Sequence, residues 1–445
     1  MSQLGILYQY EMKKILKKKM TWISFCGVVL VMAFCCFGVL LNRYVLTDAQ
    51  TGESVYYSAY ERAMDRQARG EKFNGRLIDD ILLREMQVAY ADVQTQEQER
   101  VTDNATINVS AVTTAEVPDD PAEAERLSQQ RRQYEAIYNY VRGVVGNEEV
   151  HTVDAAAFYR ARQQMIRDYE QALCLTEGEQ EYWRRHEAQT PCVYYWDMGV
   201  SMMLANSRTM LALTALMIGM VFSGVFADEH IRKTDQLVLC SRHGRGMLYL
   251  AKLLASMTLA AAAALLVGGA TLLSFGVAYG YGESWNAPLQ IYLESSPFAL
   301  TMGQGIVILL VLLLLATVLH SVLALVLSCW TRSGVASMSL MMVYTLGTLF
   351  ANVPERLRLL SQCLYLSPAK AVCASAFYDA RLVGGAGHYL TFWQTGMLLY
   401  PLLALGLALL GGNIVFGGKV YRIIHMSDGG TLKRVFRISN AFDGL

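Results

Sequence analysis

The feature that most constrains the fold is a set of long apolar stretches with almost no charge. Residues 22–41 contain no Asp, Glu, Lys or Arg, and a helix of that length crosses the hydrocarbon core of a bilayer. Five further stretches share this character, at residues 210–226, 248–277, 305–330, 335–351 and 392–416. The sequence therefore predicts an all-α polytopic membrane protein with six transmembrane helices. A signal peptide is the competing interpretation of the first stretch, but the apolar run is too long and no cleavage site precedes Asn42.

These stretches divide the chain into segments of different expected roles. In order, we expect a cytoplasmic interfacial helix at 1–20, the first span at 21–42, an extracytoplasmic helical domain at 43–206, spans two to five at 207–352 with a cytoplasmic loop at 227–252, outer helices at 353–389, the sixth span at 390–417, and a cytoplasmic tail at 418–445.

The polar insertion at residues 43–206 is too hydrophilic to span and is expected to be helical. Asn74 is a candidate N-cap for a helix over 75–92, and Asp120-Pro121 predicts the start of a second helix that ends near Val145. Thr152 or Asp154 starts a third helix that ends near Leu175. Residues 101–117 have no hydrophobic period and are expected to form a loop.

Basic residues set the expected orientation. They crowd into 1–20, into 227–252 and into the tail, which places these segments and both termini in the cytoplasm. Residues 1–20 alternate apolar and basic, as in a helix lying on anionic lipid, although a plain basic flank of the first span is the alternative. The exception to the pattern is the last outer segment, which carries Arg356, Arg358, Lys370 and Arg381.

The loop at 227–252 has its own pattern. Ile231, Thr234, Leu237, Val238 and Ser241 recur at helical spacing, which predicts a short amphipathic helix at the inner membrane surface. A cytosolic partner could press on such a helix.

This loop resembles that of type 2 ABC exporter permeases. Members of that family carry an acidic residue, a Thr, a Leu-rich helix, a Ser/Thr-(Pro)-x-x-Arg turn and a Lys that opens the third span. The matching positions here are Glu229, Thr234, Leu237–Leu239, Ser241, Arg245 and Lys252. The chain departs from the pattern at Lys233, where the family has Gly, and at Arg242-His243-Gly244, which replaces the Pro.

The resemblance implies a function and its partners. It implies a permease subunit of an ATP-driven exporter in a bacterial plasma membrane, paired with a second permease subunit of the same or a homologous chain. Soluble ABC ATPase subunits would dock on the 227–252 loop, and the coupling residues would be Glu229, Thr234, Leu237, Arg242, Arg245 and Lys252. Leu366-Ser367-Pro368 resembles the turn that the family places between short outer-leaflet helices.

The chain has no nucleotide motif of its own. Gly417-Gly418-Lys419-Val420 lacks the first Gly and the Ser/Thr of a P-loop, so the resemblance places Mg-ATP on the partner ATPase and no cofactor in this chain. His186-Glu187 begins like a zinc-protease motif, but Thr190 stands at the second ligand position, and we expect no metal. Membrane lipid is an expected partner and nucleic acid is not.

Two other groups of residues are candidates for a role. His320 lies near the middle of the fourth span, where an ionisable group either lines a pathway or is a neutral side chain bonded to a carbonyl. Cys174, Cys192, Cys363 and Cys373 fall in outer segments, where disulfides can persist. Cys174 with Cys192 and Cys363 with Cys373 are two candidate bridges, and four cysteines also allow other pairings.

Two further classes of function stay open. One is a complex for antimicrobial-peptide sensing or immunity, in which the outer domain binds the ligand. The other is a membrane-embedded enzyme, although the spans show no paired carboxylates, Ser/His pair or metal constellation. The nearly charge-free spans favour a lipid-like or amphipathic cargo over a small ion.

Overall fold

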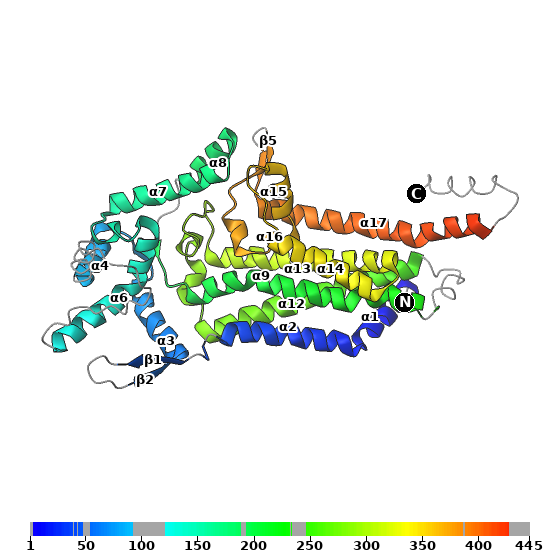
Figure 1. Ribbon diagram of the computed structural model, residues 1–445, viewed down its shortest axis with the longest axis horizontal. Coiled ribbons are helices and arrows are strands. Elements are labelled where there is room, and N and C mark those ends of the chain that lie inside the picture. Colours follow the sequence, from blue (N-terminus) through cyan, green and yellow to red (C-terminus); the bar gives the residue numbers. More distant parts are fainter. Residues whose placement is uncertain are drawn as a thin grey trace, which may run out of the picture.

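The structure is a computed structural model that describes residues 3–38, 40–41, 43–47, 54–91, 121–187, 193–231, 233, 246–385 and 388–426. The molecule is elongated, with a bundle of long parallel and antiparallel helices and a second helical unit at one end of it (Figure 1). The loop predicted at 101–117 lies outside the described residues.

The bundle contains the predicted spans. Among the described residues, five helices are long and apolar enough to cross a membrane. They are α2 (Lys19–Phe37), α9 (Met198–Phe222) continued by α10 (Gly224–Ile231), α12 (Gly246–Tyr279), α13 (Met302–Thr331) and α17 (Phe392–Met426). The sixth, α14 (Gly334–Phe350), has 17 residues and is about 26 Å long, at the lower limit for a span. The predicted fold class, an all-α polytopic membrane protein, is confirmed.

Helix α13 is the centre of the bundle. It packs against α9, α12, α14 and α17, and its Leu312, Leu313 and Ala316 are fully buried. On α12, a stripe of small residues faces inward, and a Cβ added at Gly268 would meet Leu310 of α13 at 2.8 Å. Small side chains therefore allow these two helices to approach closely inside one subunit.

The second span starts earlier than the sequence predicted. Helix α9 begins at Met198 rather than near residue 210, because the aromatic segment before it continues directly into helix. A break at Ser223 separates α9 from α10, and Ser328 of α13 spans it. The Ser328 hydroxyl donates to the Ser223 carbonyl at 2.6 Å and accepts from the N–H groups of Phe226 and Ala227 at 3.3 and 3.2 Å. An inserted side chain of this kind is a recognised cause of a helix kink.

The N-terminal helix α1 (Gln3–Leu16) lies along α12 and turns sharply into α2. Two side chains of α2 close this corner: the Thr21 hydroxyl donates to the Ile15 carbonyl and the Trp22 indole N–H donates to the Leu16 carbonyl, both at 2.9 Å. The last carbonyls of α1 thus find partners within the corner.

The polar helical unit, residues 43–47, 54–91 and 121–187, lies at the other end of the bundle from α1 (Figure 1). It consists of the hairpin β1 (Arg43–Thr47) and β2 (Ser54–Ser58) and the helices α3 (Ala59–Gly70), α4 (Asp80–Ala89), α6 (Pro121–Val145), α7 (Ala155–Ala172) and α8 (Glu177–Glu187). Ile78, Leu82, Ile137, Val141 and Phe158 are buried in its core.

Two of the predicted helix starts agree with the structure and one is wrong. Helix α6 begins at Pro121, and Asp154 caps α7 by accepting from the Ala157 N–H at 2.6 Å. Asp79, not Asn74, caps α4 by accepting from the Leu82 N–H at 2.8 Å. Asn74 instead accepts from the Trp196 N–H, because the short strands β3 (Arg76–Leu77) and β4 (Val193–Tyr194) pair beside it.

Short elements form the segment predicted as outer helices at 353–389. They are α15 (Arg358–Tyr365), α16 (Pro368–Ala371), which starts at Pro368, and the paired strands β5 (Val383–Gly385) and β6 (His388–Leu390). The described part of the chain also contains the 3₁₀ turns η1 (Glu71–Phe73), η2 (Glu149–His151), η3 (Gly282–Asn286), η4 (Leu289–Ile291) and η5 (Ala374–Phe377). Ala369, Ala371 and Val372 are buried in the bundle core, so this segment packs into the bundle rather than floating free.

The polar helical unit is fastened to this segment by buried polar contacts. Glu179 of α8 accepts from the Arg358 guanidinium at 2.5 Å and from the Leu382 N–H at 2.8 Å. Arg381 is fully buried and pairs with Asp379 through its Nε and Nη2 atoms. Two of the basic residues that broke the expected charge pattern are therefore paired with carboxylates, Arg381 in the interior and Arg358 at a half-buried position.

Candidate functional site

Ionic side chains from three helices meet at the α1 end of the bundle. Lys252 of α12 has no exposed side-chain surface, and its Nζ lies 2.7 Å from Glu229 Oε1 of α10 and 3.2 Å from Glu11 Oε2 of α1. The Glu11 side chain is also almost fully buried, at 3% exposure. A buried lysine needs such partners, because an unpaired charge in this environment is costly.

Two more lysines of the N-terminal segment complete the arrangement. Lys14 Nζ lies 2.5 Å from Glu229 Oε1, and Lys18 Nζ lies 2.7 Å from Asp228 Oδ2. We call Glu11, Lys14, Glu229 and Lys252 the charge cluster; with two carboxylates and two ammonium groups it is electrically balanced. The cluster joins α1 to both α10 and α12, so a movement of one of these helices must break or carry its ion pairs.

The environment of Lys14 favours its charged form. Burial alone would lower the pKa of Lys14, but its hydrogen bond and charge interaction with Glu229, together with the charge of Glu11, raise that pKa above the ordinary value of a lysine. Lys14 therefore stays charged at neutral pH.

Aromatic and helix-breaking features position the cluster. The Lys252 ammonium lies 5.1 Å from the centre of the Phe226 ring, in the range of a cation–π contact. Phe226 and Glu229 both belong to α10, whose start is held by Ser328 of α13. Ser328 thus links the central helix α13 to the short helix that carries Glu229.

A comparison with known protein families identifies the family of this chain. A family model described as ABC-2 family transporter protein matches residues 6–411. The chain belongs to that family. It is therefore a membrane-embedded permease component of an ABC transporter, of the kind that works with ATPase subunits. No curated protein and no solved structure gave a significant match.

Within this ABC-2 family protein, the structure brings together two of the predicted coupling residues, Glu229 and Lys252. Thr234, Leu237, Arg242 and Arg245 lie outside the described residues. Four further residues of these ion pairs were not predicted as site residues from the sequence: Glu11, Lys14, Lys18 and Asp228. A signal for Glu11 was present, since it is the one acidic residue among the lysines of residues 1–20.

His320 is buried in α13 of this permease. Its Nδ1 lies 2.7 Å from the Ala316 carbonyl one turn earlier, and its ring lies 5.8 Å from that of Tyr344 on α14. Its Nε2 is buried and has no hydrogen-bond partner among the described residues. The contact to a backbone carbonyl fits the expectation of a neutral side chain, and the free Nε2 keeps a pathway role open.

The structure describes both cysteines of one candidate disulfide and one cysteine of the other. Cys363 is exposed, whereas Cys373 is buried and its thiol contacts the Ala369 carbonyl at 3.3 Å. Both are free thiols, so the structure does not form the Cys363–Cys373 bridge, because the two side chains face different surroundings. Cys174 is free and exposed, while Cys192 lies outside the described residues.

A cleft of about 330 Å³ lies where the polar helical unit meets the bundle. Arg66 of α3, Arg132 of α6 and Glu294 line it, together with Trp196 and Asp197 just before α9. Burial raises the pKa of Asp197 to about 6. Within the described part of the chain, no group of three or more His, Cys, Asp or Glu side chains is placed to hold a metal ion.

Proposed function

We propose that this chain is the permease subunit of an ATP-driven ABC exporter, and that its charge cluster couples a separate ATPase to the membrane helices. The observation that carries the proposal is the buried Lys252, which holds α1 and α10 to the first turns of α12 through Glu11 and Glu229. Residues 227–252 include the end of α10 and the start of α12. A partner that pushes this segment therefore acts directly on the cluster.

We further propose an orientation, a membrane, partners and a class of cargo for this permease. The α1 end of the bundle is the cytoplasmic end, the polar helical unit is extracytoplasmic, and the membrane is a bacterial plasma membrane. Two permease subunits form the pathway, and Mg-ATP binds to the partner ATPase. The apolar spans support an amphipathic or lipid-like cargo.

The test uses the chain with its co-purified ATPase. Lys14→Gln removes one ion pair of Glu229 but leaves Lys252 in place, so we expect the complex to form at unchanged stoichiometry while the permease stimulates ATP hydrolysis less. Lys13→Gln is the matched control, since Lys13 is exposed on the same helix and lies outside the cluster. Equal stimulation by wild type, Lys14→Gln and Lys13→Gln would reject the coupling role, and the absence of any ATPase from the purified complex would reject the exporter.

A second candidate function is ligand sensing by the polar helical unit. The cleft supports it, because its lining offers carboxylates for the cationic side chains of an antimicrobial peptide and guanidinium groups for the carboxylates of the peptide. The carboxylates are Glu135, Asp197 and Glu294, and the guanidinium groups are those of Arg66, Arg69 and Arg132. Binding of a labelled cationic peptide to the full chain should weaken in Glu294→Gln but not in the exposed control Glu283→Gln. Equal affinities of the two variants would remove this candidate.

A further inference from the structure

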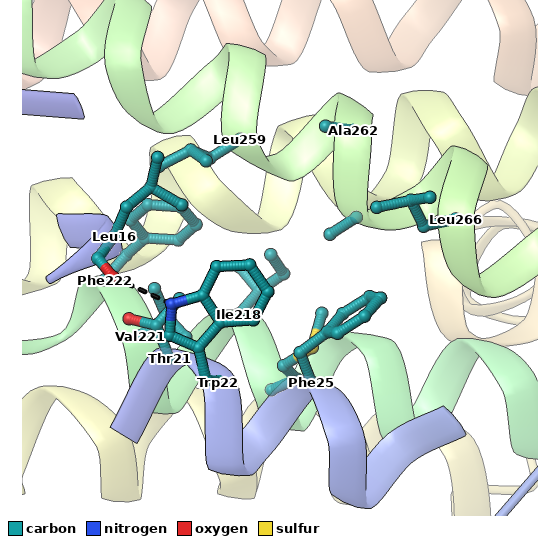
Figure 2. Close-up of a pocket in the computed structure, with 12 residues that line it drawn as sticks. Leu16, Thr21, Trp22, Phe25, Ile218, Val221, Phe222, Leu259, Ala262 and Leu266 are labelled. Atoms are coloured by element: carbon teal, nitrogen blue, oxygen red, sulfur yellow. Dashed lines mark hydrogen bonds between the residues drawn. The ribbon is translucent and has the colours of Figure 1, made fainter. Parts of the chain in front are cut away.

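A groove opens beside the corner between α1 and α2. It has a volume of about 110 Å³ and an almost wholly apolar lining. Its walls come from α1, α2, α9 and α12, as Figure 2 shows; the lining includes Leu16, Trp22, Phe25, Ile218, Ala262 and Leu266. The lining combines the small side chains of Ala262 and Ala263 on α12 with the rings of Trp22 and Phe25 on α2.

The groove is built rather than accidental. The Trp22 indole is fixed by its hydrogen bond to the Leu16 carbonyl, drawn in Figure 2, so the ring forms a wall that does not need to rearrange. Trp22 and Leu266 are 53% and 57% exposed, which opens the groove on the side of the bundle that faces lipid. In a bilayer, an apolar groove with this opening is filled by hydrocarbon.

The charges at the corner select among lipids. Lys17 directly follows the lining residue Leu16, and Lys19 precedes the lining residue Thr21 by two positions. Both lysines are exposed, and neither has an ion-pair partner among the described residues, whereas Lys18 between them is held by Asp228. Unpaired basic residues beside a membrane helix attract anionic headgroups.

We propose that this groove binds one acyl chain of an anionic membrane phospholipid whose headgroup lies against Lys17 and Lys19. The apolar lining excludes a free phosphate or a soluble anion as the occupant, and the two lysines distinguish an anionic lipid from a zwitterionic one. The proposal is independent of the ATPase, because it concerns only the chain and its membrane.

The experiment measures lipid retention by the full chain. The protein is reconstituted in nanodiscs that contain phosphatidylglycerol and phosphatidylcholine, released into mild detergent, and its bound phospholipid is identified by native mass spectrometry. Wild type should retain phosphatidylglycerol in preference to phosphatidylcholine. Replacing Lys17 and Lys19 by Gln should weaken that preference by about fivefold for each lysine removed.

A second pair of variants tests the groove itself. Ala262→Trp fills the groove from an exposed position, so the fold has room for it, and it should abolish retention of the lipid. Leu265→Trp is the matched control, since Leu265 is 64% exposed on the same helix but does not line the groove. Equal retention of phosphatidylglycerol by Ala262→Trp and Leu265→Trp, or no preference in wild type, would overturn the proposal.

Discussion

At the residue scale, the molecule depends most on Lys252. A lysine with no exposed side-chain surface is tolerated here because Glu11 and Glu229 are both within ion-pair distance. Such a group is weak evidence of net stability, since the charges must also be desolvated, but its removal leaves two carboxylates with a single ammonium group, that of Lys14. The value of the cluster is therefore specificity: it fixes how α1 lies against α10 and α12.

Lys252→Met should destabilise the fold by about 3–5 kcal/mol, because Glu11 and Glu229 are then left to share Lys14 and one buried negative charge is stranded. Unfolding in increasing sodium dodecyl sulfate, followed by loss of helix signal, measures the change. Adding Glu11→Gln to this variant removes one stranded charge and should recover part of the loss. A Lys252→Met protein as stable as wild type would show that water reaches the cluster.

At the element scale, the break between α9 and α10 is the most consequential feature. The hydroxyl of Ser328 bonds to three backbone groups around this break, the Ser223 carbonyl and the N–H groups of Phe226 and Ala227. This contact joins α13, at the centre of the bundle, to the short helix that carries the cluster.

Ser328→Ala should destabilise the α9–α10 junction by about 1–3 kcal/mol, because buried backbone groups lose their partner. Hydrogen–deuterium exchange should then increase in α10, Gly224–Ile231, and stay unchanged in α9. Ser321→Ala is the control, since this buried serine of the same helix bonds only to the Val318 carbonyl of its own helix. Similar exchange in the two variants would contradict the bracing role.

Much of this element map could be predicted from the sequence. Charge-free runs give the spans, and the Pro121 and Asp154 signals give α6 and α7. The start of α9 and the cap of α4 could not be predicted, because they depend on what the local chain packs against, as Asn74 does with Trp196. In the site, local pattern and family resemblance point to Glu229 and Lys252, whereas Glu11 enters only through the docking of a distant helix.

At the scale of the whole molecule, the polar helical unit is held to the bundle by a carboxylate. Glu179 has 1% exposed side chain and receives hydrogen bonds from Arg358, Leu382 and Thr176. Burial alone would raise the pKa of Glu179, but these bonds lower it below its ordinary value. The nearby Trp183 indole adds a hydrogen bond to the Ala380 carbonyl at 2.6 Å.

The depressed pKa gives a pH dependence of definite sign. Glu179 binds its proton more weakly in the folded state, so its contribution is fully present above about pH 4.3 and is lost as the pH falls through its folded pKa. Limited proteolysis of α8 should be constant between pH 7 and 5 and increase below about pH 4.

In Glu179→Gln this acid-induced step should disappear, because the titrating group is gone. Glu177→Gln, at an exposed position of the same helix, should keep it. An unchanged acid profile in Glu179→Gln would assign the step to another group.

The contacts of Glu179 also impose an order on biosynthesis. Its partner Leu382 lies 203 residues later in the chain, and Arg358 lies 179 residues later. At ordinary translation rates, a separation of that size corresponds to roughly 10–40 s between the synthesis of the carboxylate and that of its last donor. The polar helical unit is therefore synthesised early, but its contacts with residues 358–382 form late. A nascent chain halted before α15 exposes the surface of α8 that these contacts later cover, and a chaperone or protease can recognise it.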